Sequence, residues 1–200
     1  MLNPLFTKLE GKMPLGQEER AALAGLIQSK ARRLPARQDL YVEGDAISPI
    51  RIILDGWACR YDQFADGRRQ IVELFLPGDI LGQDCQFAER QDHSACSISA
   101  LSYALIPRGE LDALARQFPA IAQALLWDSS ITAAIHRQWI RSLGRLSATQ
   151  RIAHLFCELL YRAARAGLAR GTTFDMPMGQ RDLGDARGLS TVQVNRTVQL

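Results

Sequence analysis

The side chains best suited to chemistry lie near the end of the sequence, in the stretch QRDLGDARGLSTVQVNRTVQL at positions 180–200. A guanidinium such as that of Arg196 can donate two parallel hydrogen bonds to O6 and N7 of a guanine, which discriminates between bases by about 1–3 kcal/mol. The carboxamide of Asn195 can pair with adenine or hold a phosphate. The candidate contacts to a nucleic acid are therefore Ser190, Thr191, Val192, Gln193, Asn195 and Arg196. The alternative is that these side chains only cap the helix or face solvent.

Two short helices joined at a glycine would present this cluster, and the sequence predicts them. Leu183 and Ala186 are expected to form the inward face of the first helix. Gly188 can adopt the positive φ of a tight turn without steric cost, and Leu189 would fill the corner between the helices. This pattern is typical of a helix-turn-helix, in which the start of the second helix enters the major groove of DNA.

The second of these helices is expected to begin at Ser190. The hydroxyl of Ser190 can accept a hydrogen bond from the backbone N–H of Gln193, whose side chain can reach back, so the spacing fits a capping box. Val194 and Val198 recur at helical spacing and are expected to face inward. The polar residues would then surround the exposed amino end of the helix.

Charge is distributed unevenly along the chain, whose formal net charge is +3. Residues 137–200 carry ten arginines against four acidic residues, whereas residues 1–136 carry fourteen basic against seventeen acidic residues. Neutralisation of DNA phosphates requires a basic surface such as this one. Binding to DNA through it is expected to weaken as the salt concentration rises. An arginine-rich coding bias is the alternative explanation.

Composition and cysteine usage indicate a soluble, cytoplasmic protein, since 47% of the 200 residues are hydrophobic without any long apolar run. A membrane span needs roughly 18 consecutive apolar residues, and the start, MLNPLFTKLEGK, lacks the order of a secretory signal. We therefore expect no membrane partner. The cysteines form no CxxC pair and show no zinc-ligand spacing, so we expect reduced, mostly structural thiols at Cys59, Cys85, Cys96 and Cys157.

The first half of the chain predicts a small helical cover followed by antiparallel strands. Residues 1–29 contain a helix over about 18–29 with an apolar side. From 31 to 107, short β-branched or aromatic runs are interrupted at regular intervals by Gly44, Gly56, Gly67 and Gly78. Such punctuation predicts an antiparallel sandwich or barrel. We expect Asp66 and Gly67 to form a two-residue hairpin turn with positive φ at both residues.

A long helix is predicted to follow. Alternating steps of four and three residues connect Ile121, Leu125, Asp128, Thr132, Ile135, Trp139, Ser142 and Leu146. A single helix needs a partner for such a seam, so we expect a homodimer through residues 120–146; the alternative is a helix folded onto its own barrel. A second capping box, from Ser147 to Gln150, predicts a boundary. The expected domains are a sensor at 1–117, a dimerisation helix at 118–146 and a helix-turn-helix domain at 147–200.

This order of elements resembles the cyclic-AMP receptor protein/FNR family of bacterial transcription regulators. The resemblance covers nearly the whole chain and is carried by YVEGD at 41–45, IILDG at 52–56, DGRRQ at 66–70, LPGD at 76–79 with Gly82, RIA at 151–153 and the helix-turn-helix. It implies an α+β fold: a β-barrel sensor of the double-stranded β-helix or jelly-roll type, a dimerisation helix and a winged helix-turn-helix. The sequence stops at Leu200, before the wing.

The same resemblance implies a small-molecule effector, a homodimer on double-stranded DNA and contacts with RNA polymerase. Family members that bind cyclic nucleotides use a Gly-Glu pair and an Arg-Ser/Thr-Ala segment. The corresponding residues here are Gly82 and Gln83, and His93 and Ser94. A mostly neutral imidazole replaces a permanent guanidinium, so we do not expect cyclic AMP to bind.

Two further residues of the implied effector pocket are His136 and Arg137, where the dimerisation helix would face the barrel; the alternative is that both face solvent. FNR-type members hold an iron–sulfur cluster with amino-terminal cysteines, and this chain has none before Cys59, so we do not expect that cluster. The sequence leaves haem ligation by His93 or His136 as an open alternative. The effector itself is unknown from the sequence.

One residue of the second helix departs from the family pattern. Many family members carry glutamate at the position of Val192, which cannot accept from a cytosine amine but can touch a thymine methyl group, so we expect a different target sequence. Two other functions are alternatives to DNA binding. A sensing barrel could regulate a protein partner without binding DNA, and a cupin-like barrel could hold a catalytic metal. The metal enzyme is disfavoured, because the only histidines are His93, His136 and His154, on three different elements.

Overall fold

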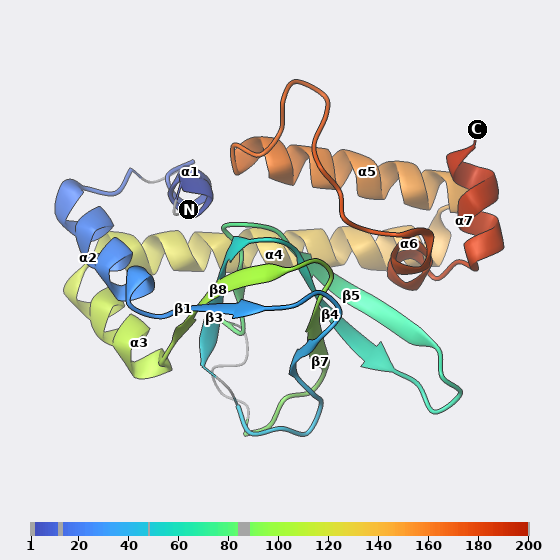
Figure 1. Cartoon of the computed structure of the whole chain (residues 1–200). Helices are drawn as coiled ribbons and strands as arrows, with labels where there is room; N and C mark the ends of the chain where they lie inside the picture. The colour runs from blue at the N-terminus through green and yellow to red at the C-terminus, as the bar shows by residue number, and fades with distance from the viewer. Residues whose placement is uncertain (1–2, 12–13, 48, 84–88, 200) are drawn as a thin grey trace.

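The computed structural model describes residues 3–11, 14–47, 49–83 and 89–199. In Figure 1 the long helix α4 passes between the strands on one side and α5 on the other. The helices are α1 (Asn3–Leu9), α2 (Gln17–Gln28), α3 (Arg108–Gln117), α4 (Pro119–Arg145), α5 (Ala148–Arg165), α6 (Gln180–Arg187) and α7 (Thr191–Val198). The strands are β1 (Ala31–Leu34), β2 (Asp39–Tyr41), β3 (Ile50–Asp55), β4 (Ala58–Gln63), β5 (Arg69–Phe75), β6 (Ile80–Leu81), β7 (Ser94–Ser97) and β8 (Leu101–Ile106).

The strands form two antiparallel sheets, with orders β1-β8-β3-β6 and β2-β7-β4-β5. Apolar side chains from both sheets meet in a core between them, to which β3, β5 and β8 contribute Ile53, Phe75 and Leu101. All four regularly spaced glycines have positive φ, as turns between short strands require. The prediction of an antiparallel sandwich or barrel is confirmed.

The hairpin between β4 and β5 is present, but its turn differs from the prediction. Residues 64–68 form the loop, and positive φ occurs at Gly67 and not at Asp66. The carboxylate of Asp66 instead accepts the backbone N–H of Arg68 at 3.0 Å. This side-chain bond closes the turn with only one residue in the left-handed region, so a type I′ turn is not needed.

Helices α1 and α2 cover one end of the sandwich. Leu9 and Ile27 are fully buried, and they share a core with Ile52 of β3 and Ile106 of β8. The predicted helical cover is therefore confirmed, with α2 within one residue of its expected limits.

The seam predicted for the dimer is covered by the protein's own chain. Ile121 and Leu125 are buried in the core that includes α1 and β3, while Trp139 is buried among residues of α5 and α6. Thr132, Ile135 and Leu146 are half-buried. The heptad spacing correctly marked the inner face of α4. For Ile121, Leu125 and Trp139 the assignment to a second copy was wrong, because the same chain supplies the apolar surface that buries them.

Helix α5 begins at the predicted capping box. The backbone N–H of Ser147 donates to Gln150 Oε1 at 3.0 Å, and the N–H of Gln150 donates back to Ser147 Oγ. The predicted core positions Ile152, Leu155 and Leu159 are buried. Within the described part of the chain, no helix is both long and apolar enough to span a lipid bilayer.

Candidate nucleic-acid interface and effector pocket

A helix-turn-helix is formed by α6 and α7. Gly188 ends α6 in the left-handed conformation, at φ 62° and ψ 42°. Ser190 caps α7, because its Oγ accepts the N–H of Gln193 at 3.2 Å while Gln193 Oε1 accepts the N–H of Ser190 at 2.9 Å. The buried side chains of Leu183 and Ala186 lie on the inner face of α6, as predicted.

A second glycine of the motif was missed by the sequence reasoning. A Cβ atom on Gly184 would lie 2.5 Å from the carbonyl oxygen of Leu189, so only glycine allows the turn at Leu189 to pack this closely against α6. The side chain of Val194, on the inner face of α7, is fully buried, and Leu189 packs against the same core. The signal that could have revealed this contact is a glycine inside a predicted helix, where it costs roughly 1 kcal/mol relative to alanine and can mark a close packing contact.

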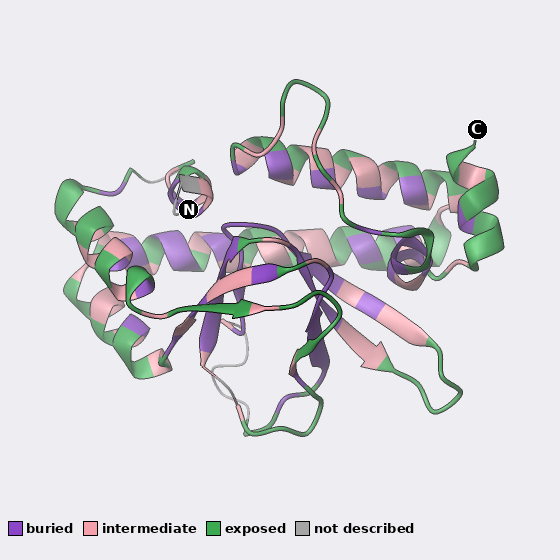
Figure 2. Ribbon diagram, in the orientation of Figure 1, coloured by how far each residue is buried: buried purple, intermediate pink, exposed green. Residues whose placement is uncertain are grey.

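Most residues of helix α7 are exposed (Figure 2). All six candidate residues are exposed, namely Ser190, Thr191, Val192, Gln193, Asn195 and Arg196. Val198 is 49% exposed rather than inward-facing, which contradicts the prediction. It lies in the last turn of α7, where the helix has passed the edge of the core that buries Val194.

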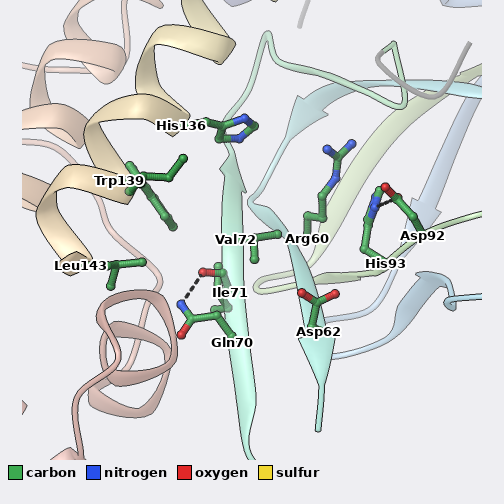
Figure 3. Close-up of a pocket in the computed structure, with 11 residues that line it drawn as sticks. Arg60, Asp62, Gln70, Ile71, Val72, Asp92, His93, His136, Trp139 and Leu143 are labelled. Atoms are coloured by element: carbon green, nitrogen blue, oxygen red, sulfur yellow. Dashed lines mark hydrogen bonds and ion pairs between the residues drawn. The ribbon is translucent and has the colours of Figure 1, made fainter.

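A cleft of about 360 Å³ lies between the sandwich and α4. Figure 3 shows His136, Trp139 and Leu143 of α4 on one side, with Val72 and Arg60 on the strands opposite. A smaller cavity of about 110 Å³ shares Arg60 and His136 with the cleft and extends to Gln83 and Asp128.

Some of the predicted effector residues line the cleft, some line the smaller cavity, and some line neither. Gln83 lines the smaller cavity and His93 lines the cleft, while His136 lines both. Ser94 is buried, and its hydroxyl accepts the N–H of Glu43 at 3.0 Å. The carbonyl of Gly82 accepts from Arg108 at 2.5 Å. Arg137 is exposed and belongs to the lining of neither space.

The amide of Gln83 is already engaged, because it donates to the carbonyl of Leu125 at 2.9 Å. His93 uses both ring nitrogens: Nε2 lies 2.9 Å from the hydroxyl of Tyr41, and Nδ1 contacts the carboxylate of Asp92. An axial haem ligand needs a free ring nitrogen, so His93 does not fit that role. Among the described residues, no group of three or more His, Cys, Asp or Glu side chains could hold a metal ion.

The chain resembles proteins of known function over most of its length. Residues 31–118 match the family model described as "Cyclic nucleotide-binding domain". The chain is 29% identical over 180 residues to the transcriptional activator protein FnrL of Cereibacter sphaeroides, which covers 88% of this chain and 72% of FnrL. It is 26% identical over 182 residues to the anaerobic regulatory protein of Haemophilus influenzae, covering 91% and 70%. The solved structure of FixK2 from Bradyrhizobium japonicum has a TM-score of 0.74 at 26% identity, covering 84% of this chain and 82% of FixK2.

These similarities join a cyclic-nucleotide-type sandwich, a long central helix and a helix-turn-helix in a single chain. Together they indicate the cyclic-AMP receptor protein/FNR family. The relatives are named as regulators and not as enzymes. The resemblance inferred from short motifs is therefore confirmed, and so is the α+β fold that it implied.

The helix-turn-helix is anchored to the central helix by Arg187. Its guanidinium is fully buried and lies 3.9 Å from the ring centroid of Trp139. Glu158 of α5 joins both residues: its Oε2 lies 3.5 Å from Arg187 and accepts Trp139 Nε1–H at 2.6 Å. Burial lowers the pKa of Arg187 to about 10, although Glu158 opposes this shift. Sequence reasoning had assigned Trp139 to the dimer seam and no role to Arg187.

A second attachment holds α6 against the sandwich, and we call it the α6 latch: Arg37, Arg69, Asp182 and Asp185. Arg37 donates to both carboxylate oxygens of Asp182, at 2.6 and 2.7 Å. Arg69 of β5 donates to Asp182 at 3.1 Å and to Asp185 at 2.9 Å. The carboxylate of Asp182 is almost completely buried between them. No local pattern could have predicted these pairs, which span more than a hundred positions.

Acidification is expected to weaken the α6 latch. Burial alone raises the pKa of Asp182, but bonds from Arg37 and from the N–H of Gly179 more than reverse this, so the pKa lies below its ordinary value. A carboxylate of this kind stabilises the fold above its unfolded pKa of about 3.9, and the stabilisation is lost as pH falls through the lower, folded pKa. Asp182→Asn should thus be less stable than wild type at neutral pH, with a gap that narrows in acid. Urea unfolding at several pH values measures this, with the exposed Asp175→Asn as control.

Proposed function

We propose that the protein is a homodimeric, effector-responsive transcription regulator that binds double-stranded DNA through α7. The observation that carries this proposal is the capped helix α7, whose polar side chains are exposed while Val194 fixes it to the core. The sensor corresponds to residues 1–117, the dimerisation helix to 118–146 and the DNA-binding domain to 147–200. The relatives named as transcriptional activators support the same assignment.

Residues of α7 are assigned roles by their chemistry. Arg196 would read guanine through two hydrogen bonds, Asn195 adenine or a phosphate, and Val192 a thymine methyl group. Ser190, Thr191 and Gln193 lie at the amino end of the helix, where backbone N–H groups and short side chains contact phosphates in helix-turn-helix complexes. The 68% exposure of Val192 leaves its methyl groups available for such a contact.

Arg196→Ala is expected to weaken binding to the specific DNA site by about 1–3 kcal/mol, or roughly 5-fold to 150-fold, because both bonds to guanine are lost. Binding to random DNA should change much less. Mobility-shift titrations at fixed salt measure both, and Arg170→Ala is the charge-matched control, since Arg170 is exposed on a loop outside the helix-turn-helix. An equal loss on specific and random DNA would show that Arg196 touches only phosphate. If the wild-type protein retards no genomic fragment selectively, the result favours the alternative, a sensing barrel that regulates a protein partner.

We propose that the dimer forms through the outer face of α4. Leu126, Ala133 and Ile140 recur every seven residues on the exposed side of α4, where Ile140 also borders the cleft. Leu126 is 69% and Ile140 71% exposed, the highest values among the large apolar side chains of the described residues. Apolar residues that recur with a heptad spacing on an exposed helix are stabilised by pairing with a second helix.

The proposed effector is a small molecule bound between the sandwich and α4, where His136 belongs to both spaces. Cyclic AMP is not proposed, because the amide of Gln83 already donates to the backbone carbonyl of Leu125 and His93 replaces the guanidinium that a phosphodiester needs. Calorimetry with cyclic AMP should show no heat of binding, and saturable micromolar binding would contradict this. RNA polymerase is proposed as the protein partner and the cytoplasm as the location.

A further inference from the structure

Two cysteines face each other inside the sensor, and neither lines the cleft. Cys59 of β4 and Cys96 of β7 are direct cross-strand partners, and their sulfur atoms lie 3.5 Å apart. Both are reduced and buried, with Cys59 fully enclosed and Cys96 retaining 6% exposure. A disulfide requires Sγ atoms about 2.05 Å apart and Cα atoms about 4.4–6.8 Å apart. Directly opposed residues of antiparallel strands meet the second condition, since their Cα atoms lie about 4.5–5.5 Å apart.

The surroundings make the two sulfur atoms chemically unequal. The guanidinium of Arg69 lies 3.7 Å from Cys96 Sγ, and its charge favours a thiolate there. The S–H of Cys59 holds the pKa of Cys96 below its ordinary value, and Arg69 and Arg37 act in the same direction, while burial and Asp39 oppose them. The same hydrogen bond and burial raise the pKa of Cys59. Cys96 is therefore the nucleophile, and Cys59 the thiol that stays protonated.

We propose that Cys59 and Cys96 form an oxidation site for hydroperoxides, whose redox state is transmitted to α6 by Arg69. The Cys96 thiolate attacks a peroxide oxygen, the O–O bond breaks, and the departing oxygen leaves with one proton as hydroxide, giving a sulfenic acid on Cys96. The sulfur of Cys59 then attacks Cys96 Sγ, the S–O bond breaks, and the hydroxyl group leaves as water with the Cys59 proton. With hydrogen peroxide the two thiols lose two electrons, and the peroxide is reduced to two molecules of water.

The oxidation is coupled to the α6 latch because Arg69 serves both. In the reduced form its guanidinium is shared between Cys96 and the carboxylates of Asp182 and Asp185. A disulfide carries no charge, so oxidation removes the anion that competes with these carboxylates. The two pairs with α6 should become stronger, and α6 should be held more tightly against β5.

The first experiment asks whether the disulfide forms. In a Cys85→Ser, Cys157→Ser background, the two thiols of interest are the only ones left in the sequence. Hydrogen peroxide followed by denaturation and alkylation should give a protein that has lost two hydrogen atoms and takes up no alkylating reagent. Cys59→Ala should stop at a sulfenic acid that dimedone traps on Cys96, while Cys96→Ala should leave Cys59 unreacted. Equal reactivity of the two single-cysteine proteins, or no disulfide, would overturn the proposal.

The second experiment asks whether Arg69 selects Cys96. Arg69→Gln is expected to slow the reaction with peroxide at neutral pH by about tenfold, because one pKa unit changes the thiolate fraction tenfold, and to shift the rate profile to higher pH. Arg69→Lys should restore most of the rate. A change in rate without a shift of the profile would mean that Arg69 acts only on packing, which would contradict its assigned role.

The third experiment follows α6 by amide hydrogen exchange. Oxidation should slow exchange at residues 180–187 in the background protein but not in Arg69→Gln. Unchanged or faster exchange in the background protein would refute the coupling to α6. None of these measurements involves DNA, so their failure would not bear on the proposed transcriptional function.

Discussion

Ile140→Glu is expected to dissociate the homodimer, raising its dissociation constant by at least about 100-fold. Full burial of an isoleucine side chain stabilises an interface by about 1.5–3 kcal/mol, and a two-fold axis makes every substitution count twice. The loss of about 3 kcal/mol or more corresponds to at least two orders of magnitude in the dissociation constant. Two glutamates facing each other across the seam add repulsion. Analytical ultracentrifugation over a range of concentrations measures the change.

Gln138→Glu is the matched control for this variant. It places the same charge on the same helix, two residues away, at an exposed position outside the proposed seam. It should sediment as wild type. An Ile140→Glu protein that stays dimeric would show that the outer face of α4 is not the interface. Trp139→Ala should instead lower the stability of each subunit, because Trp139 is buried within its own chain beside Arg187.

Asp79→Ala is expected to lower the free energy of unfolding by about 3–5 kcal/mol, the usual cost of removing one member of a buried ion pair. Asp79 accepts from Lys8 of α1 at 2.6 Å, from Arg162 of α5 at 2.7 Å and from the N–H of Leu76 at 2.6 Å. Burial by itself raises the pKa of Asp79, but the two cations more than reverse this. The carboxylate thus joins α1, the sandwich and α5, and its loss leaves two half-buried cations without their shared partner.

Urea denaturation followed by tryptophan fluorescence measures this loss. Asp79→Asn should fall between the alanine variant and wild type, because an amide oxygen can still accept one of the three bonds. Asp175→Ala, at an exposed loop position, is expected to change stability by less than about 0.5 kcal/mol. A loss below about 1 kcal/mol for Asp79→Ala would mean that water or Asp128, which also contacts Lys8, replaces the missing carboxylate.

Some parts of the fold were predictable because local sequence alone specifies them. The Ser190 and Ser147 capping boxes each depend on two residues three positions apart, and the turn at Gly188 depends on one residue. The regular glycines likewise mark strand ends through their own φ values. The hairpin turn was predicted at the right place with the wrong type, because the bond from Arg68 to Asp66 competes with the expected geometry.

The candidate site was predicted less completely. The exposure of Arg196 and its neighbours follows from the helical period around Val194, and it was foreseen. The effector residues were only partly placed: Gln83, His93 and His136 line cavities, whereas Arg137 does not. Cys85 belongs to the predicted thiols but lies outside the described residues. The pairing of Cys59 with Cys96 was not foreseen, because strand register determines it.

By itself, the sequence determined the order of the elements, the family and the residues that α7 exposes, since helix caps, glycine turns and the apolar period act within a few residues of the chain. Only the tertiary structure decided which surface covers each apolar helix face and which charged side chains form ion pairs. A heptad records that one face of α4 is buried, but not whether the same chain or a second copy buries it. Arg37 and Asp182 are 145 positions apart. Their pairing depends on how the sandwich and the helix-turn-helix pack, and the burial of long-range contacts, not local propensity, supplies the free energy that fixes that arrangement.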